Sequence, residues 1–482
     1  MNLSGALSNA MSGLTANARG TVVVSSNIAN ALNENYGRRD IELGTNATQS
    51  SGGVTVTAIS RQANPILAHQ TRLATSGYAQ SEALAQFATN LEQLWGSVDT
   101  IGSVAEQLTK FEAALVSAAA DPSSDTRLRN LAYTAESFAT SIRSASDGLQ
   151  DLRSRADAEI ATAVDDLNAG LKSIETLNQQ IMTAKHLGQD TLSLLDQRDG
   201  VLSGIAEYVP VHVIDREDGA VALFSSKGRT LVDGRAIQIS FKATPTVLAH
   251  MTVGNGLLSE MEVDGAPTSA ATGAALSGGK LEALFQIRDD ASVNAQSRLD
   301  GIARDIIDRF GASGPDATIT AGGAGLFTDN GSAFLPANET GIAGRISLNS
   351  TLNADATDIW KWRTGVNATA PGDVGDSTLL VALQNQISAS LTPNSVALGT
   401  ASQSLANHIL DMTTDVGSDR VRLTASKDSA DAILTNFKQM QASDGVNTDQ
   451  ELQKLIELEK AYAANARVVQ VVDDMLSELL SI

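Results

Sequence analysis

The chain has 482 residues, a formal net charge of −21 and no cysteine. Its length is sufficient for two to four domains with cores of their own. The negative charge disfavours nucleic acid and anionic membrane surfaces as partners, and the absence of cysteine excludes disulfides, thiolate zinc sites and cysteine nucleophiles. Aromatic residues make up only 4% of the chain, a composition better suited to helix bundles than to a ligand cavity.

The first predicted element is an amphipathic helix close to the N-terminus. Apolar or small residues recur at alternating steps of three and four, the spacing of a heptad seam. The seam residues are Leu3, Leu7, Ala10, Leu14, Asn17, Thr21, Val24 and Ile28. Gly5, Gly13 and Gly20 dilute the helix propensity, so we expect a weak seam. An Asn- and Gly-rich run at 25–37 then ends the helix and turns the chain.

Two short strands and a series of long helices are predicted next. In chain order the segments are strands at 41–43 and 54–59 around a turn at 50–53, then helices at 65–95 and 104–120, a long helical region towards 186, and a helix at 192–208. In the last of these helices, Arg198 stands between Asp196 and Asp199. The simplest interpretation is an ion-pair cluster on the helix surface, and a buried role between domains is the alternative.

The sequence changes character at Val209, where short apolar runs alternate with turn signals such as Asp218-Gly219. This pattern predicts a small β-rich module that extends to about Gly273. Its predicted strands lie at 211–214, 220–224, 229–232, 237–241 and 247–253. Helix is expected again at 279–310, and a Gly-, Ala- and Asp-rich stretch follows to about 376. Helices resume near 379 and at 402–440.

The last segment, 447–482, has the cleanest heptad seam in the chain, preceded by an N-cap and an acidic first turn at 448–451. Its seam residues are Leu455, Leu458, Tyr462, Asn465, Val469, Val472, Leu476 and Leu479. Two seams at opposite termini favour one coiled pair of chain ends; two unrelated amphipathic helices on a globular core are an equally good interpretation. Because few large side chains support either arm, we expect the arms to be loosely ordered in the monomer and rigid when several subunits surround them.

These elements predict a mainly α fold with a β-rich insertion. It would have paired N- and C-terminal coiled-coil helices, a central long-helix bundle and a small outer β domain. The predicted domains are 1–45 with 446–482 for the terminal coiled coil, 46–208 with 277–445 for the central helical bundle with short β-hairpin elements, and 209–276 for the β-rich domain.

A search for chemistry finds no catalytic, cofactor-binding or metal site. No pair of histidines has the helical spacing of zinc ligands, and no Gly-x-Ser-x-Gly motif is present. The segment Gly273–Lys280 fails as a phosphate loop because Ala274 replaces the first glycine and Leu281 replaces the hydroxyl residue. The acidic pairs at 165–166, 289–290 and 473–474 are expected to face solvent. The sequence therefore predicts a protein that is not an enzyme.

Motifs at both ends of the chain resemble one known family. They are Asn9–Leu14 and Ser26–Asn30 within Leu3–Gly37, and Gly445–Asn447, Ala461–Ala466 and Val472–Leu476 at the far end. This combination is similar to the bacterial flagellar axial proteins, the family of rod, hook and hook-associated subunits. The middle of the chain resembles the hook-associated junction members at Asp121-Pro122, Leu194–Asp199 and Gly278–Asp289. The chain departs from them at Asn35–Arg38, where relatives usually show Gly-Tyr followed by Ser or Thr and Arg.

The resemblance implies a structural protein that links the hook to the filament, is required for filament assembly, and is secreted unfolded through the flagellar type III apparatus. Implied partners are copies of itself in a ring-like or helical homo-oligomer, the hook protein, the second junction protein, and an export chaperone on the C-terminal helix. We expect neither nucleic-acid binding nor membrane insertion, and no cofactor. The absence of a basic residue before Arg19 and of an apolar core segment predicts that no cleavable secretory signal is present.

The candidate assembly and chaperone contacts are the large seam residues, although each could instead be intramolecular packing. They are Leu455, Leu458, Tyr462, Asn465, Val469, Val472, Leu476, Leu479, Leu3, Leu7, Leu14 and Ile28. Two alternatives to a junction protein stay open. One is another flagellar axial subunit of the hook or rod, which would have a β-dominated middle. The other, from a different class, is a cytosolic helical scaffold or an enzyme with an unrecognised site.

Overall fold

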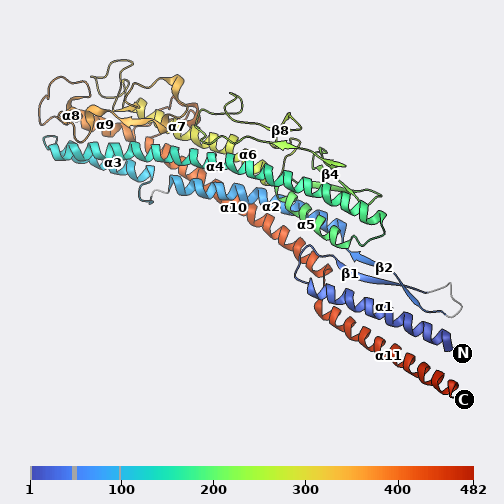
Figure 1. The fold of residues 1–482 in the computed structure, drawn as a ribbon. Coiled ribbons are helices and arrows are strands. Elements are labelled where there is room, and N and C mark those ends of the chain that lie inside the picture. Colours follow the sequence, from blue (N-terminus) through green and yellow to red (C-terminus); the bar gives the residue numbers. More distant parts are fainter. Residues whose placement is uncertain (1–2, 46–51, 97–98, 482) are drawn as a thin grey trace. The chain divides into compact units, whose positions relative to one another are not determined.

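The computed structural model describes residues 3–45, 52–96 and 99–481. It is mainly helical with small antiparallel sheets, which confirms the predicted fold class (Figure 1). The chain forms two compact units, one from Met1–Ser76, Asn168–Ile237 and Ala430–Ile482, the other from Gly77–Leu167 and Gln238–Ser429. The domain boundaries predicted after residues 45, 208, 276 and 445 stay predictions.

The first unit contains the two terminal helices, a β-hairpin and a four-stranded antiparallel sheet in the order β3-β4-β5-β6. Its elements are α1 (Leu3–Ala29), β1 (Arg38–Thr45), β2 (Val54–Gln62), α5 (Leu192–Tyr208), β3 (Val211–Asp215), β4 (Val221–Ser225), β5 (Thr230–Asp233), β6 (Arg235–Ala236) and α11 (Thr448–Leu480). Strands β1 and β2 pair with a register irregularity between Glu42 and Leu43. The predicted turn at 50–53 lies partly outside the described residues.

The second unit contains the helical core of the chain. Its elements are α3 (Val104–Ala120), β7 (Ile239–Ser240), β8 (Met261–Val263), β9 (Ala266–Thr268), α6 (Gly279–Gln286), a π-helical turn (Ile287–Ala291), α7 (Ser292–Arg309), β10 (Phe327–Asp329), β11 (Ile346–Leu348), α8 (Lys361–Thr364), α9 (Thr378–Ser388) and short 3₁₀ turns at 336–338, 342–344, 350–352 and 396–398. Three helices contribute residues to both units: α2 (Pro65–Trp95), α4 (Asp125–His186) and α10 (Leu405–Asp444).

Local signals account for the helix ends. Ser103 caps α3 by accepting a hydrogen bond from the Glu106 backbone N–H at 3.1 Å, and Asp121-Pro122 follows its last residue, where proline prevents continuation. Helix α4 contains no proline and runs for 62 residues as a single helix. Its apolar stripe packs in a core centred on four fully buried phenylalanines. These are Phe111, Phe138, Phe310 and Phe327, with ring centroids 5.7–6.2 Å apart.

The strand predicted at 247–253 is wrong. This apolar run forms turns, because the buried Arg153 donates hydrogen bonds from its two Nη atoms to the carbonyls of Leu248 (3.2 Å) and Met251 (2.7 Å). A side chain thus satisfies backbone acceptors that a neighbouring strand would otherwise occupy. The remaining strands of 209–276 belong to two sheets, β3-β4-β5-β6 in the first unit and β7-β8-β9 in the second.

The stretch 311–376, to which the sequence assigned no elements, contains β10, β11, α8 and short 3₁₀ turns, joined by loops. Trp362 is 1% exposed and donates from its indole N–H to the Leu352 carbonyl at 2.9 Å. Asp300 of α7 anchors the same region by accepting from the backbone N–H groups of Gly341 (2.7 Å) and Ala343 (2.9 Å). Fixed partners of this kind hold the loops without regular secondary structure.

Asp300 makes the stability of the second unit depend on pH. Burial raises its pKa to about 6 from an ordinary value of 3.8, although three N–H donors oppose the shift. A raised pKa means that the folded state binds the proton more tightly, so the stabilisation is complete below about pH 4 and is lost as the pH rises through 6. We expect the unfolding free energy of the wild type to fall by about 2 kcal/mol more than that of Asp300→Asn between pH 4 and pH 7.

The measurement is denaturant unfolding followed by tryptophan fluorescence. All three tryptophans, Trp95, Trp360 and Trp362, belong to the second unit, so the signal reports on that unit. Asp290→Asn, at an exposed position in the adjacent π-helical turn, is the control. Parallel pH profiles for the wild type and Asp300→Asn would contradict this assignment.

Candidate assembly surface

The two ends of the chain meet. Helices α1 and α11 pack along their lengths in opposite directions, with both termini at the same end of the pair (Figure 1). Gly13 faces Asn465, Gly20 faces Leu458, and Asn27 contacts Glu451. Each step of seven residues forward along α1 is therefore matched by a step of seven back along α11, the repeat of a heptad seam. This arrangement confirms the coiled pair of chain ends and removes the alternative of two unrelated helices.

The glycines of α1 form part of its contact face with α11, in addition to lowering its helix propensity. A Cβ added to Gly13 would lie 2.6 Å from Nδ2 of Asn465, and one on Gly20 would lie 3.1 Å from the Leu458 methyl carbons. The backbones consequently approach more closely than larger side chains would allow. Of the buried small residues of this face, sequence reasoning assigned Ala10 and Val24 to the seam and missed the other five. The full set is Gly5, Ala10, Gly13, Ala16, Gly20, Val23 and Val24.

The structure places the predicted contact residues in three groups. Val472 is buried. Half-buried are Leu3, Leu7, Leu14, Ile28, Leu455, Leu458, Asn465 and Val469. Exposed are Tyr462 at 49%, Leu476 at 39% and Leu479 at 64%. Leu458 and Asn465 face α1 directly. Contacts of these residues with other proteins stay a prediction.

A row of exposed apolar side chains follows the rest of α11. Apart from Leu480, the last residue of the helix, it consists of Leu452, Ile456, Tyr462, Val468, Val471, Met475, Leu476 and Leu479, each at least 39% exposed. We call these eight residues the exposed row. Single exposed apolar residues are ordinary, whereas this many along one helix is the composition expected of an interaction surface.

Asn27 joins the helix pair to the β-hairpin. Its Nδ2 donates to the Arg39 carbonyl (2.9 Å) and to Oε2 of Glu451 (3.1 Å), and its Oδ1 accepts from the Arg39 N–H (3.0 Å) and the Tyr36 hydroxyl (2.9 Å). The side chain is fully buried, and every donor and acceptor of its amide has a partner. Asn27 therefore holds α1, β1 and α11 together at one point.

Glu451 completes this connection from the first turn of α11. Its side chain is 1% exposed, and its Oε1 accepts from Nε of Arg38 at 2.8 Å. One turn further along, Nζ of Lys454 donates to Oδ1 of Asp40 at 2.7 Å. A carboxylate in the first turn also interacts favourably with the positive end of the helix dipole. The start of α11 is thus tied to α1 and to β1 by charged hydrogen bonds.

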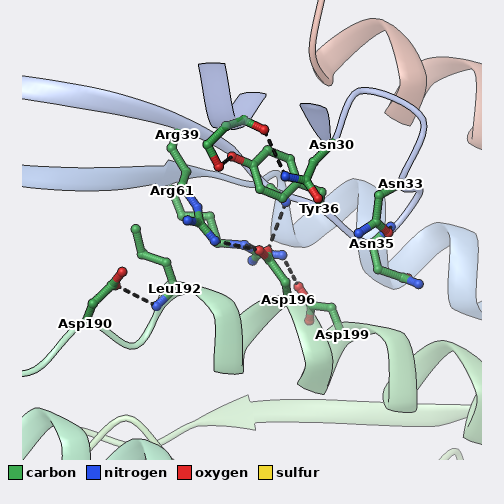
Figure 2. A network of polar contacts seen from close by, with 12 residues as sticks. Asn30, Asn33, Asn35, Tyr36, Arg39, Arg61, Asp190, Leu192, Asp196 and Asp199 are labelled. Carbon is green, nitrogen blue, oxygen red and sulfur yellow. Dashed lines mark hydrogen bonds and ion pairs between the residues drawn. The ribbon is translucent and has the colours of Figure 1, made fainter. Parts of the chain in front are cut away.

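A second polar cluster ties the hairpin to α5 (Figure 2). Asp196 accepts from Nε of Arg61 (2.8 Å), from Nη2 of Arg39 (3.2 Å) and from the Gly37 N–H (2.9 Å), while Nη2 of Arg61 reaches Asp199 at 2.6 Å. Charge-assisted bonds with several partners of this kind are stronger than isolated surface pairs. The Asn-, Tyr- and Arg-rich run after α1 therefore connects the hairpin to α5 through side-chain hydrogen bonds.

Family models match two parts of the chain. The model of the flagellar hook-associated protein FlgK helical domain matches residues 88–326, and that of the flagellar basal body rod FlgEFG protein C-terminal region matches residues 439–482. Two relatives named flagellar hook-associated protein 1 align over nearly their whole lengths. The one from Salmonella typhimurium is 25% identical over all of both chains, and that from Bacillus subtilis is 23% identical over 98% of this chain and 97% of its own.

The chain belongs to the flagellar hook-associated protein 1 family. Members of this family are structural proteins and not enzymes. A solved structure of the flagellar hook junction protein FlgK from Burkholderia pseudomallei shares the fold, with a TM-score of 0.59 at 14% identity over 77% of this chain and 99% of that one. The match to the rod-protein C-terminal model covers α11 and thus the exposed row.

Two details of this hook-associated protein differ from the sequence interpretation. Arg198 is buried and donates to the Gly219 carbonyl at 2.9 Å, while Asp196 and Asp199 pair with Arg61, so the predicted surface cluster around Arg198 is wrong. Gly37 lies in the segment Asn35–Arg38, where the chain departs from the family pattern that it resembles. A Cβ there would lie 2.3 Å from Nε of Arg61, so the close approach of Arg61 requires glycine.

One pair of histidines lies close together in the described part of this family member. His69 and His212 lie with ring centroids 5.0 Å apart, a pairing that the sequence did not reveal. Burial first, and then His212 and Arg72, lower the pKa of His69. Within the described ranges, no three His, Asp or Glu side chains gather as metal ligands. Nor does any helix there combine the length and apolar character needed to span a bilayer.

Proposed function

We propose that this hook-associated protein is the hook–filament junction subunit, that it links hook to filament and that filament assembly requires it. The observation that carries the proposal is the antiparallel pair of α1 and α11 with the exposed row on its surface. A chain end that leaves eight apolar side chains in water is suited to association with other subunits. The 62-residue helix α4 supports this choice over a hook or rod subunit, for which a β-dominated middle is expected.

The proposed partners follow from the same surface and from the family. The exposed row would contact further copies of this chain in a ring-like or helical assembly, the hook protein on one side, and the second junction protein on the other. Before assembly, an export chaperone would cover α11, since an uncovered apolar helix favours aggregation. Export through the flagellar type III apparatus and a final location outside the cell, at the junction, belong to this proposal.

Deletion of the gene tests the proposal. We expect mutant cells to keep their hooks, to lose their filaments and to release unpolymerised filament protein into the medium. Electron microscopy of the cells and immunoblots of the medium measure these outcomes, and the intact gene supplied in trans is the control. Mutant cells without hooks would favour a hook or rod subunit. Mutant cells with normal filaments would reject a flagellar junction role.

We further propose that the terminal arms become rigid only in the assembly. The contact between α1 and α11 consists mainly of small or half-buried side chains, which return little free energy for ordering two long helices. We expect fast amide exchange in both helices of the monomer and strong protection in the core around Phe111 and Phe138. Equal protection in the arms and in that core would contradict this expectation.

A further inference from the structure

We infer that the buried pair Asn27–Glu451 sets the register in which α1 and α11 associate. Three contacts between the helices repeat every seven residues: Gly13 with Asn465, Gly20 with Leu458, and Asn27 with Glu451. The first two contain glycine, which accepts either Asn or Leu opposite it. Only in the third does a hydrogen-bond donor on α1, the amide of Asn27, meet an acceptor on α11, the carboxylate of Glu451. This inference refines the proposed function, because it names the residues that specify the geometry of the terminal pair.

The competing arrangements differ by one heptad. In one of them Gly20 would face Asn465 and Gly13 would face Val472, and both contacts are acceptable for glycine. Asn27 would then face Leu458, so its Nδ2 would lose the bond to Glu451 at a cost of about 1–3 kcal/mol, while its bonds to Arg39 and Tyr36 would remain. In the opposite shift Gly13 would face Leu458 and Gly20 would face Glu451, and the carboxylate would lose Asn27.

The Asn27–Glu451 contact distinguishes the native register from the slipped ones because both side chains are buried and hydrogen-bonded. Asn27 has no exposed surface and uses all four of its hydrogen-bonding positions. Glu451 is equally buried and is held by Arg38 of β1. Two of these bonds involve α11, from Asn27 and Arg38 to Glu451, and Leu458, one heptad further along, has no side-chain acceptor for either. A single buried polar contact of this type is a known means of specifying coiled-coil register.

Register has consequences for assembly because a slip of one heptad moves α11 by about 10 Å along α1. The exposed row would move by the same distance relative to the hairpin. Subunits with different registers would present different surfaces to their neighbours. The pair Asn27–Glu451 is therefore a specificity determinant of the terminal pair and more than a source of stability.

Cysteine cross-linking tests the inference, because the natural chain contains no cysteine. The native register is reported by Gly13→Cys with Asn465→Cys, at positions close enough for a disulfide. A slipped register is reported by Gly20→Cys with Asn465→Cys, and the opposite slip by Gly13→Cys with Leu458→Cys. Each pair is oxidised in the full-length purified chain, and the cross-linked fraction is read by non-reducing electrophoresis and peptide mapping.

We expect only the native reporter to cross-link when Asn27 and Glu451 are present. With Asn27→Leu and Glu451→Leu together, an apolar contact replaces the polar one. The helices should then stay paired but no longer favour the native register over the slipped registers. The cross-linked fraction of the two slipped reporters should then rise from background to a value comparable with that of the native reporter. Glu457→Leu makes the same chemical change at an exposed position of α11 and should leave the pattern unchanged.

An unchanged native pattern in the double Leu variant would overturn the inference. Loss of all three cross-links there would mean that Asn27 and Glu451 serve pairing and not register, and would overturn it as well. Because the assay uses purified chain, its outcome does not depend on the junction role. A failed deletion phenotype with a positive register assay would reject only the proposed function.

Discussion

Truncation after Gln453 is expected to abolish filament formation and chaperone binding while leaving the second unit folded. The deletion removes Leu458, Asn465 and Val472, which form the α11 side of the helix pair, and nearly all of the exposed row. Gly13 and Gly20 lose the residues that face them, so the small face of α1 loses its partner. The effect on the proposed assembly should be complete.

Three measurements check this expectation. Electron microscopy should show hooks without filaments, and a pull-down with the organism's export chaperone should recover the full chain but not the truncated one. Tryptophan fluorescence should give an unfolding curve for the second unit within about 0.5 kcal/mol of the full chain, since the sites are independent. Lys460→Ala, at an exposed position of α11, is the control. Filaments of normal length on cells with the truncated chain would contradict the prediction.

Arg288→Ala is expected to destabilise the second unit by about 3–5 kcal/mol. Arg288 lies in the π-helical turn between α6 and α7 and has no exposed surface. Its Nη1 donates to Oδ1 of Asp157 at 2.7 Å, and its guanidinium forms two 2.8 Å bonds with Asp289. Removing the cation leaves the fully buried carboxylate of Asp157 with the Thr244 N–H but without its ion-pair partner.

The control for Arg288→Ala is Arg298→Ala, which removes a similar ion pair with Asp415 at an exposed site. Exposed pairs contribute little, so a loss below about 1 kcal/mol is expected there. The double variant Arg288→Met with Asp157→Leu should be less destabilised than Arg288→Ala, because neither charge is left unpaired. Denaturant unfolding followed by tryptophan fluorescence measures all three variants. Equal losses for Arg288→Ala and Arg298→Ala would show that burial of the pair is unimportant.

Helices whose ends depend on local signals were predictable from the sequence. Periodicity and the flanking residues predicted 65–95, 104–120 and 192–208, and the structure has α2, α3 and α5 at these positions. Proline at the start of α2 and Asp121-Pro122 after α3 act through the neighbouring backbone alone. The seam of α11 was also predictable, because Leu458, Asn465 and Val472 repeat every seven residues along one stretch of chain.

The parts that sequence reasoning missed depend on contacts between distant residues. Asn27 and Glu451 are 424 positions apart, and composition alone favours an exposed location for both side chains. Asp289 was expected in solvent because it is adjacent to Asp290, yet it pairs with the buried Arg288. Residues 247–253 were predicted as a strand because periodicity cannot show that Arg153 satisfies their carbonyls. Buried polar partners, chosen by tertiary structure, explain each of these differences.

The long separation of α1 and α11 in the sequence determines when they can pair. The ribosome makes α1 early and α11 more than 400 residues later, so α1 must wait for its partner while everything between them is synthesised. Chains interrupted before α11 cannot close this pair. The two helices can therefore pair only after α11 has been synthesised. A chain that lacks α11 keeps an unpaired α1.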